Sequence, residues 1–332
     1  MPVNLNRDEA QLFHHFIRHL GRWLDCTSAA RIFTLEVSEK AGKCPILIAA
    51  VLCFAARHQG KKEQGEEAYE RAITLLIDRL NESPVRYDEM LLSAVLLLHF
   101  ADQLNTSNQD CPRDKHHLKG TSSILRASMP TPFIDPSATS LRDAAFWVHV
   151  RQALYNSTIS QEPLDIDFSL ELLPMPDSLM DTHPLAWLRR ETAWANQILW
   201  ITACVANFCF SGPKMTDGAT TRAAAWQELW DKNQAWQKNR PKAFDPIGRG
   251  PAQDRRVFEE VWFTADWHAC NSSMGNAQLL IILCHTVFIW GPLMTSSAER
   301  KEILWMLKQF EEMHAWRTAW IVDALKDEWG MG

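Results

Sequence analysis

Patterns that mark many enzymes are missing from this sequence of 332 residues. It has no glycine-rich phosphate loop and no G-x-S-x-G elbow around a nucleophilic serine. None of its eight cysteines has the C-x-x-C spacing of a zinc knuckle or a redox site. We therefore predict no catalytic residue, no metal, no cofactor and no enzymatic activity.

Membrane and secretion signals are also missing. The N-terminal residues MPVNLNRDEAQ lack the apolar run of a signal peptide, so we expect a protein that is not secreted. The most apolar helical stretch, 88–105, falls short of the ~20 residues that cross a bilayer and is interrupted by Glu89, His99 and Asp102. The cysteines are scattered through apolar runs, which is typical of buried thiols in a reducing compartment.

A strongly basic surface is absent as well. The chain has 34 Lys and Arg against 40 Asp and Glu, a net charge of -6. Its longest basic clusters are Lys61-Lys62, Arg189-Arg190, 238–242 and Arg255-Arg256. Since affinity for nucleic acid depends on many Lys and Arg contacts to phosphates, we expect no direct DNA binding by this chain.

Helical patterns run through almost the whole chain. The stretch 88–105 is apolar around its full circumference, which predicts a central helix, at about 88–104, covered by other helices. Further helices are predicted at 7–25, 45–58, 64–81, 115–128, 140–159, 182–210, 219–239, 256–270, 277–290, 297–313 and 315–329, the last two as a hairpin. Asn6 and Glu9 are placed as a capping box for the first of them, Ser140 as the cap of 140–159, and Ser296 with Glu299 as the start of the hairpin. The segment 31–37 is expected to be extended or irregular. The predicted fold class is all-α, a multi-helix array with no sheet.

The chain is expected to form a single domain, 1–332. Residues 160–181 are rich in Pro and Asp and have little periodicity, so they are the best place for a sub-domain boundary. All 15 tryptophans except Trp23 lie at or after position 147, which indicates that large rings fill the C-terminal half.

One face of the helix 140–159 is a candidate ligand site. Trp147, Arg151 and Tyr155 are spaced i, i+4 and i+8, and a guanidinium between two aromatic rings can stack on them and still bind a carboxylate. The alternative is a structural arginine that pairs with Asp165 and Asp167 in the following loop. Both interpretations remain open at the level of sequence.

A second candidate face lies on the helix 182–210. Glu191 and Trp194 share it with Trp187 and Ile198, so we include Glu191 and Trp194 among the candidate ligand-binding residues. The alternative is that Trp194 and Trp200 serve only in packing.

Two other groups of polar residues are weaker candidates. His15 and His19 have the i, i+4 spacing that can hold a metal, but one pair supplies too few ligands, and a solvated helix face is the simpler interpretation. Asp266, His268 and Cys270 are close in sequence, but no nucleophile motif accompanies them.

Several segments, taken in order, resemble a known family. They are LFHHFIRHLGRWLDCTSAARIFTLEV, CPILIAAVLCFAARH, DEMLLSAVLLLHFADQLN with HHLKGTSSILRA, SLRDAAFWVHVRQALYNSTI with PLDIDFSLELLP, HPLAWLRRETAWANQI, AAWQELWDKNQAW, VWFTADWH, LCHTVFIWGPL and AWIVDALKDEW. Together they resemble the fungal-specific transcription factor domain, the helical regulatory region that follows the binuclear zinc cluster of fungal six-cysteine activators. The resemblance implies a nuclear, transcription-regulatory protein that acts through protein contacts and small-metabolite sensing. The implied partners are zinc-cluster transcription factors or a second copy of the chain.

Two features depart from that family. The zinc-cluster module, with its six cysteines and basic helix, is not in this sequence, so the resemblance implies no DNA reader here. Only ten residues, ACNSSMGNAQ, separate His268 from Leu279, where the resemblance leads us to expect several dozen. This contraction near 269–278 would leave apolar surface that is exposed or used in self-association. Two alternatives stay open: an enzyme or ligand-binding protein built on the same scaffold, for example in a biosynthetic pathway, and a structurally compromised gene product.

Overall fold

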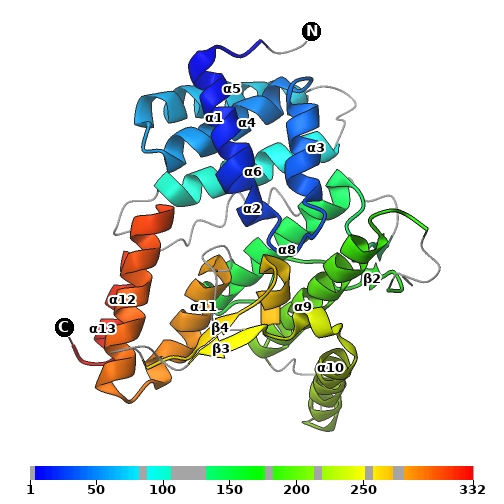
Figure 1. The fold of residues 1–332 in the computed structure, drawn as a ribbon, viewed down its shortest axis with the longest axis vertical. Helices are drawn as coiled ribbons and strands as arrows, with labels where there is room; N and C mark the ends of the chain where they lie inside the picture. The colour runs from blue at the N-terminus through cyan, green and yellow to red at the C-terminus, as the bar shows by residue number, and fades with distance from the viewer. Residues whose placement is uncertain are drawn as a thin grey trace.

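The fold is predominantly helical, as predicted (Figure 1). The structure is a computed structural model that describes residues 4–81, 88–105, 132–175, 182–212, 219–250, 257–271 and 280–331. Two short strand pairs, which the sequence did not predict, accompany the helices. Strand β1 (Phe133–Ile134) is parallel to β2 (Glu171–Leu172), and β3 (Gly248–Gly250) is antiparallel to β4 (Glu260–Trp262).

The predicted helix 7–25 is present but is not uniform. It consists of α1 (Arg7–His15), a π-helical turn (Phe16–Leu20) and α2 (Gly21–Leu24). Its N-terminus has the expected capping box, because Asn6 and Glu9 each accept a hydrogen bond from the other's main-chain N–H, at 2.9 and 3.0 Å. The side chains of Phe16, Leu20 and Leu24 are buried on the face that meets the core.

The expectation of an extended segment at 31–37 was wrong, because helix α3 (Ile32–Ala41) occupies it. The cap of this helix comes from a residue outside the segment. The carboxylate of Asp25 accepts hydrogen bonds from the main-chain N–H groups of Phe33 (3.0 Å) and Thr34 (2.9 Å). These groups have no partner within the helix itself, so a buried carboxylate satisfies the first turn.

The predicted central helix is confirmed as α6 (Glu89–Asn105), in which every side chain from Leu91 to Ala101 is buried. Asp88 caps it by accepting a hydrogen bond from the N–H of Leu91 at 2.8 Å. Helix α4 (Pro45–His58) lies beside it and is equally enclosed, with all side chains from Leu47 to Ala56 buried. Helix α5 (Lys62–Asn81) covers α4 with a half-buried face.

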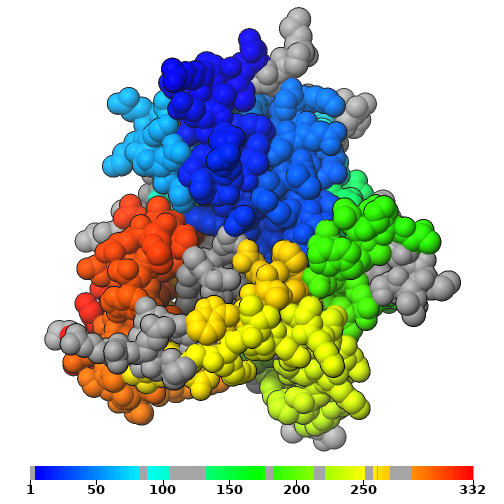
Figure 2. Space-filling view, in the orientation of Figure 1, coloured from blue at the N-terminus to red at the C-terminus, as the bar shows by residue number. Residues whose placement is uncertain are grey.

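A second group of helices lies below the first in Figure 1. Helix α8 (Leu141–Ser160) begins at the predicted cap Ser140, whose hydroxyl accepts from the N–H of Asp143 at 3.1 Å. Helix α9 (Ala186–Phe210) begins four residues after the predicted start, because His183 and Pro184 form a turn before it. Helix α10 (Ala219–Asn239) packs on α9 and projects from the molecule at the lower right of Figure 2.

By length and composition, α9 is the one helix in the described part of the chain that could cross a membrane. This is weak evidence, since buried helices of other proteins meet the same criterion. Contacts with α8 on one side and α10 on the other account for its apolar composition.

The prediction of a helix at 256–270 was wrong for the part of this segment that the structure describes, which begins at residue 257. Instead, β4 pairs with β3, and a 3₁₀ turn, η3 (Asp266–Asn271), follows. The sequence EVWF suits a strand when a partner is available, and the partner is the glycine-rich segment 248–250. The segment 115–128 and most of the contraction near 269–278 lie outside the described residues, and the boundary in 160–181 stays a prediction.

The chain ends in a helical hairpin, as predicted. Helix α11 (Leu280–Trp290) and a 3₁₀ turn (Gly291–Leu293) lead to α12 (Ser297–His314) and α13 (Ala319–Glu328). Ser296 and Glu299, predicted to start the hairpin, form a capping box at the N-terminus of α12. Most buried side chains form one core shared by these helices, α4, α6 and α8, and a smaller cluster joins α9 to α10.

Candidate functional site

Arg151 on α8 contacts the turn between α2 and α3. Its Nη1 donates to the hydroxyl of Thr27 at 2.6 Å, and its Nη2 donates to the carbonyl oxygen of Leu24. Its observed partners therefore lie more than a hundred residues away in sequence, and they differ from Asp165 and Asp167, the partners that the structural alternative named.

The same turn carries Asp25, a carboxylate that is only 5% exposed. Burial raises the pKa of Asp25, although hydrogen bonds from Thr34 and Phe33 and the charge of Arg151 oppose that rise. Gly21 allows the close packing here, because an added Cβ would lie 2.6 Å from Cγ2 of Thr34. Arg151 thus supports a buried carboxylate that in turn caps α3.

Trp147 and Tyr155, the other candidates on α8, are buried in separate surroundings. The Nε1 of Trp147 donates to the carbonyl oxygen of Asp135 at 3.1 Å, and its ring meets Trp200 edge to face at 6.3 Å. The ring of Tyr155 lies 6.0 Å from that of Trp316, in the turn of the C-terminal hairpin. The structure gives these three side chains different partners, and none of them lines the cavity described below.

Glu191 on α9 holds η3 in place. Its Oε2 accepts a hydrogen bond from Nε1 of Trp267 at 2.7 Å and lies 3.1 Å from Nε2 of His268. Burial alone would raise the pKa of Glu191, but the contacts with His268 and Trp267 lower it below its ordinary value. The hydroxyl of Thr264 bonds Nδ1 of His268 at 2.7 Å on the other side.

The order hydroxyl, imidazole, carboxylate also occurs in acyl-transfer enzymes. Here the contact from His268 to Glu191 lacks hydrogen-bond geometry, and Thr264 is one turn from His268 in the same short segment. Burial raises the pKa of Asp266, against the opposing charges of Arg22 and Arg31. These residues form a packing unit that joins η3 to α9.

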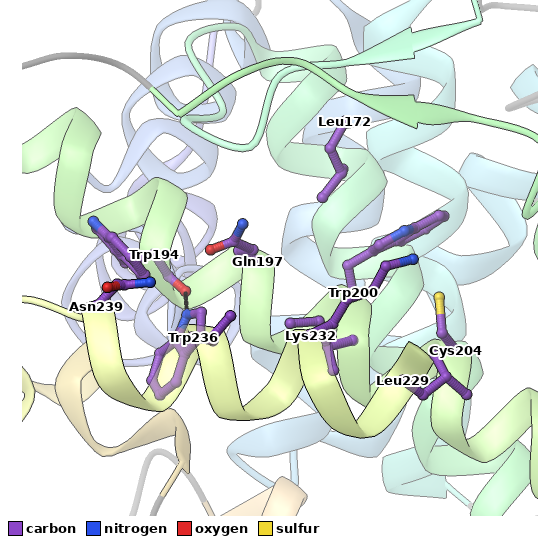
Figure 3. A pocket seen from close by; sticks show the side chains of 11 residues that line it. Leu172, Trp194, Gln197, Trp200, Cys204, Leu229, Lys232, Trp236 and Asn239 are labelled. Atoms are coloured by element: carbon purple, nitrogen blue, oxygen red, sulfur yellow. Dashed lines mark hydrogen bonds between the residues drawn. The ribbon is translucent and has the colours of Figure 1, made fainter. Parts of the chain in front are cut away.

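Trp194 is the predicted candidate that lines a cavity. The cavity has a volume of about 400 Å³ and lies between α9 and α10, with β2 at one end (Figure 3). Its lining residues are Leu172, Trp194, Gln197, Trp200, Ile201, Cys204, Leu229, Lys232, Ala235, Trp236 and Asn239. The Nε1 of Trp236 donates to the carbonyl oxygen of Trp194 at 2.9 Å, which ties the two helices together at this point.

Two stripes of side chains build this cavity. On α9 they are Trp194, Gln197, Ile201 and Cys204, and on α10 they are Leu229, Lys232, Trp236 and Asn239. In each helix the spacing is i, i+3, i+7 and i+10, the repeat of one helix face. Apart from Trp194 these residues were not predicted as a site, although the matching stripes in adjacent helices were a signal that could have found them.

The far side of α9 is fixed to the rest of the molecule, which leaves the stripe free to face α10. The hydroxyl of Thr192 accepts from the N–H of Ala29 at 2.9 Å, and the side-chain amide of Asn196 donates to the carbonyl oxygen of Pro136 at 2.9 Å. Both side chains are buried. The cavity therefore has one rigid wall, α9, and one wall, α10, with most of its side chains exposed.

The cavity is mainly apolar, with three tryptophan rings and a few polar groups. The rings of Trp194 and Trp236 meet edge to face at 6.2 Å. Lys232 is exposed at the rim, where its Nζ lies 2.6 Å from Glu228. Burial raises the pKa of Cys204 to about 11, so the thiol is neutral at pH 7 and serves as a polarisable wall rather than a nucleophile.

Within the described residues, no group of three His, Cys, Asp or Glu side chains is arranged to hold a metal ion. Comparison of the chain with protein-family models, with curated protein sequences and with solved structures finds no match. The cavity between α9 and α10 is accordingly the feature from which a functional argument can start.

Proposed function

We propose that this chain is a transcription-regulatory domain that binds a small molecule between α9 and α10 and acts through protein contacts without reading DNA itself. The observation that carries the ligand-binding part is the aromatic cavity. The transcriptional part rests on the sequence resemblance, which also suggests the nucleus and either a zinc-cluster relative or a second copy as partner. Neither part requires catalysis by the chain.

The size and lining of the cavity support a ligand of defined chemistry. Pockets for small molecules typically enclose ~300–1,000 Å³ and combine apolar walls with a few polar groups. Trp194, Trp200 and Trp236 offer ring faces and edges for a flat aromatic molecule, and Lys232 at the rim offers a positive charge. A flat ligand with one anionic group fits this arrangement best.

Ligand binding would also change the outer surface of the protein. Helix α10 contacts the described part of the chain chiefly through α9, and its side chains Trp226 and Trp230 are exposed. A molecule that bridges the two stripes would hold α10 on α9 more firmly. The effect would then reach a partner protein through the position of α10.

The test uses anilinonaphthalene sulfonate, a flat aromatic anion that fluoresces when bound. Ala235 lines the cavity but is exposed, so Ala235→Trp should fill the cavity without disturbing a buried contact. We expect the affinity of this variant for the probe to be lower than that of the parent by roughly tenfold or more. Ala224→Trp, at an exposed position of α10 outside the cavity, is the matched control. Equal affinity of both variants and the parent would show that the cavity is not the binding site.

The regulatory part needs a separate measurement. The chain fused to an unrelated DNA-binding domain should change expression of a reporter gene that carries the cognate sites, and a fusion with Ala235→Trp should lose any response to an added ligand. A fusion that leaves reporter expression at the level of the DNA-binding domain alone would refute the transcriptional role while leaving probe binding intact.

A further inference from the structure

Four histidines from three parts of the chain meet where the C-terminal hairpin contacts the N-terminal helices. His15 ends α1, His19 lies in the π-helical turn, His58 ends α4 and His314 ends α12. We refer to these four residues as the histidine cluster. The Nε2 of His15 lies 3.0 Å from Nδ1 of His58, and the rings of His15 and His19 are 4.9 Å apart. His314 acts on the pKa of His58, and its ring lies 6.3 Å from that of Trp23.

The histidine cluster lies beside an aromatic contact between the hairpin of α12 and α13 and the N-terminal helices. Trp316, in the turn between α12 and α13, is only 3% exposed. Its ring lies 6.1 Å from Trp23 of α2, 6.5 Å from Phe100 of α6 and 6.0 Å from Tyr155 of α8. Trp23 in turn meets the ring of His58 edge to face at 5.2 Å. The end of α12 therefore docks on the N-terminal helices through one tryptophan and the histidine cluster, and its approach to them is visible in Figure 1.

Charge in the cluster would work against this contact. Among the described residues, the charged groups that act on His15 are His19 and Lys61, and those that act on His58 are His15, His314 and His19. None of them is an acid. The Nε2 of His314 is buried without a hydrogen-bond partner among the described residues. Each added proton therefore meets positive neighbours and a desolvated site.

We propose that the histidine cluster is a proton-sensitive latch, which holds the hairpin of α12 and α13 on the N-terminal helices at neutral pH and releases it when the surroundings become acidic. Release would expose Trp23 and Trp316, which are both buried in the docked state. This latch is independent of ligand binding between α9 and α10.

The direction of the pH effect follows from the shifted pKa values. Burial lowers the pKa of His58 to about 4, with the neighbouring histidines adding to the effect, and burial likewise lowers the pKa of His15 and of His314. In the released state His58 and His314 lose the burial and mutual repulsion that docking imposes, so the pKa of each rises toward 6.5 and they bind more protons. Docking is then fully favourable above pH 6.5 and weakens as the pH falls toward 4.

The test follows the full chain by circular dichroism between pH 7 and pH 4. We expect the near-ultraviolet signal of the docked tryptophans to disappear while the far-ultraviolet signal of the helices remains. In Trp316→Phe the acid-sensitive part of the near-ultraviolet signal should be smaller. Loss of both signals at one midpoint would mean that the whole chain unfolds and would refute a latch.

Substitutions then identify the residues responsible. His58→Gln keeps hydrogen-bonding groups but cannot be charged, so the acid midpoint should fall by about one pH unit. His14→Gln, on the exposed side of α1, is the matched control and should not move it. If His58→Gln does not fold at pH 7, His314→Gln provides the same test from the hairpin side of the contact. An unchanged midpoint in the folded variant overturns the proposal.

Discussion

Arg151 shows how far the role of a side chain depends on the segment opposite it. The spacing of Trp147, Arg151 and Tyr155 suggested a ligand site on one helix face, and it correctly indicates that the three share an orientation on α8. What lies opposite each of them is decided by other segments. For Arg151 this is the turn with Leu24 and Thr27, which carries the buried carboxylate of Asp25.

Removal of this guanidinium should therefore destabilise the protein. In Arg151→Ala the carboxylate of Asp25 stays buried without its positive neighbour, and we expect the free energy of unfolding to fall by about 3 kcal/mol. Chemical denaturation measures the change. Arg18→Ala, at an exposed position in the π-helical turn Phe16–Leu20, is the control. A loss below about 1 kcal/mol would show that Arg151 is not a structural support and would return it to the list of ligand-binding candidates.

At the scale of helices, burial separates the elements that hold the fold together from those that present surface. Helix α6 is buried on every side between Leu91 and Ala101, and α4 is buried from Leu47 to Ala56. Helix α10 is the opposite case, since of its described side chains only Trp236 is buried. The stability of the chain should depend on α4 and α6, and its response to partners on α10.

Truncation of a side chain in the middle of α6 tests this division. Leu97 is fully buried, so Leu97→Ala should lower the free energy of unfolding by about 2–5 kcal/mol through lost burial and the cavity left behind. Leu35, which is 60% exposed on α3, is the matched control, and Leu35→Ala should change stability by less than about 0.5 kcal/mol. A melt of Leu97→Ala that overlays that of the parent would contradict the central place of α6.

At the scale of the whole molecule, the net charge and its distribution bear most directly on which partners the chain can bind. The net charge is -6, and the basic residues are dispersed in short clusters. Several arginines that could contribute to a basic surface are engaged internally, for example Arg57 with Asp102 at 2.7 Å and Arg79 with Asp88 at 3.2 Å. Phosphate binding by such a surface would be weak.

The purified chain should accordingly give no specific shift of promoter DNA at physiological salt, with or without added zinc. A typical DNA-binding protein makes about six to ten phosphate contacts and places an element in a groove to read bases. Recruitment to chromatin in cells would then have to run through a partner protein. A salt-sensitive, sequence-specific complex formed by residues 1–332 alone would refute this part of the proposal.

Features set by neighbours in sequence were predictable from the sequence itself. The caps at Asn6, Ser140 and Ser296 were predicted correctly because a capping hydrogen bond joins residues two or three positions apart. The central helix was predictable because a stretch that is apolar all round is stable only when it is enclosed. The all-α class follows from the same local patterns.

The tertiary structure alone decided which faces meet. The cap of α3 comes from a turn outside the helix, β4 exists because a glycine-rich segment lies beside it, and the partners of Arg151 are more than a hundred residues away. The cavity of Trp194 and the contact of His15 with His58 likewise join separate helices. Periodicity fixes which side chains share a face, but the contacts of that face depend on loop paths and packing, which no local pattern encodes.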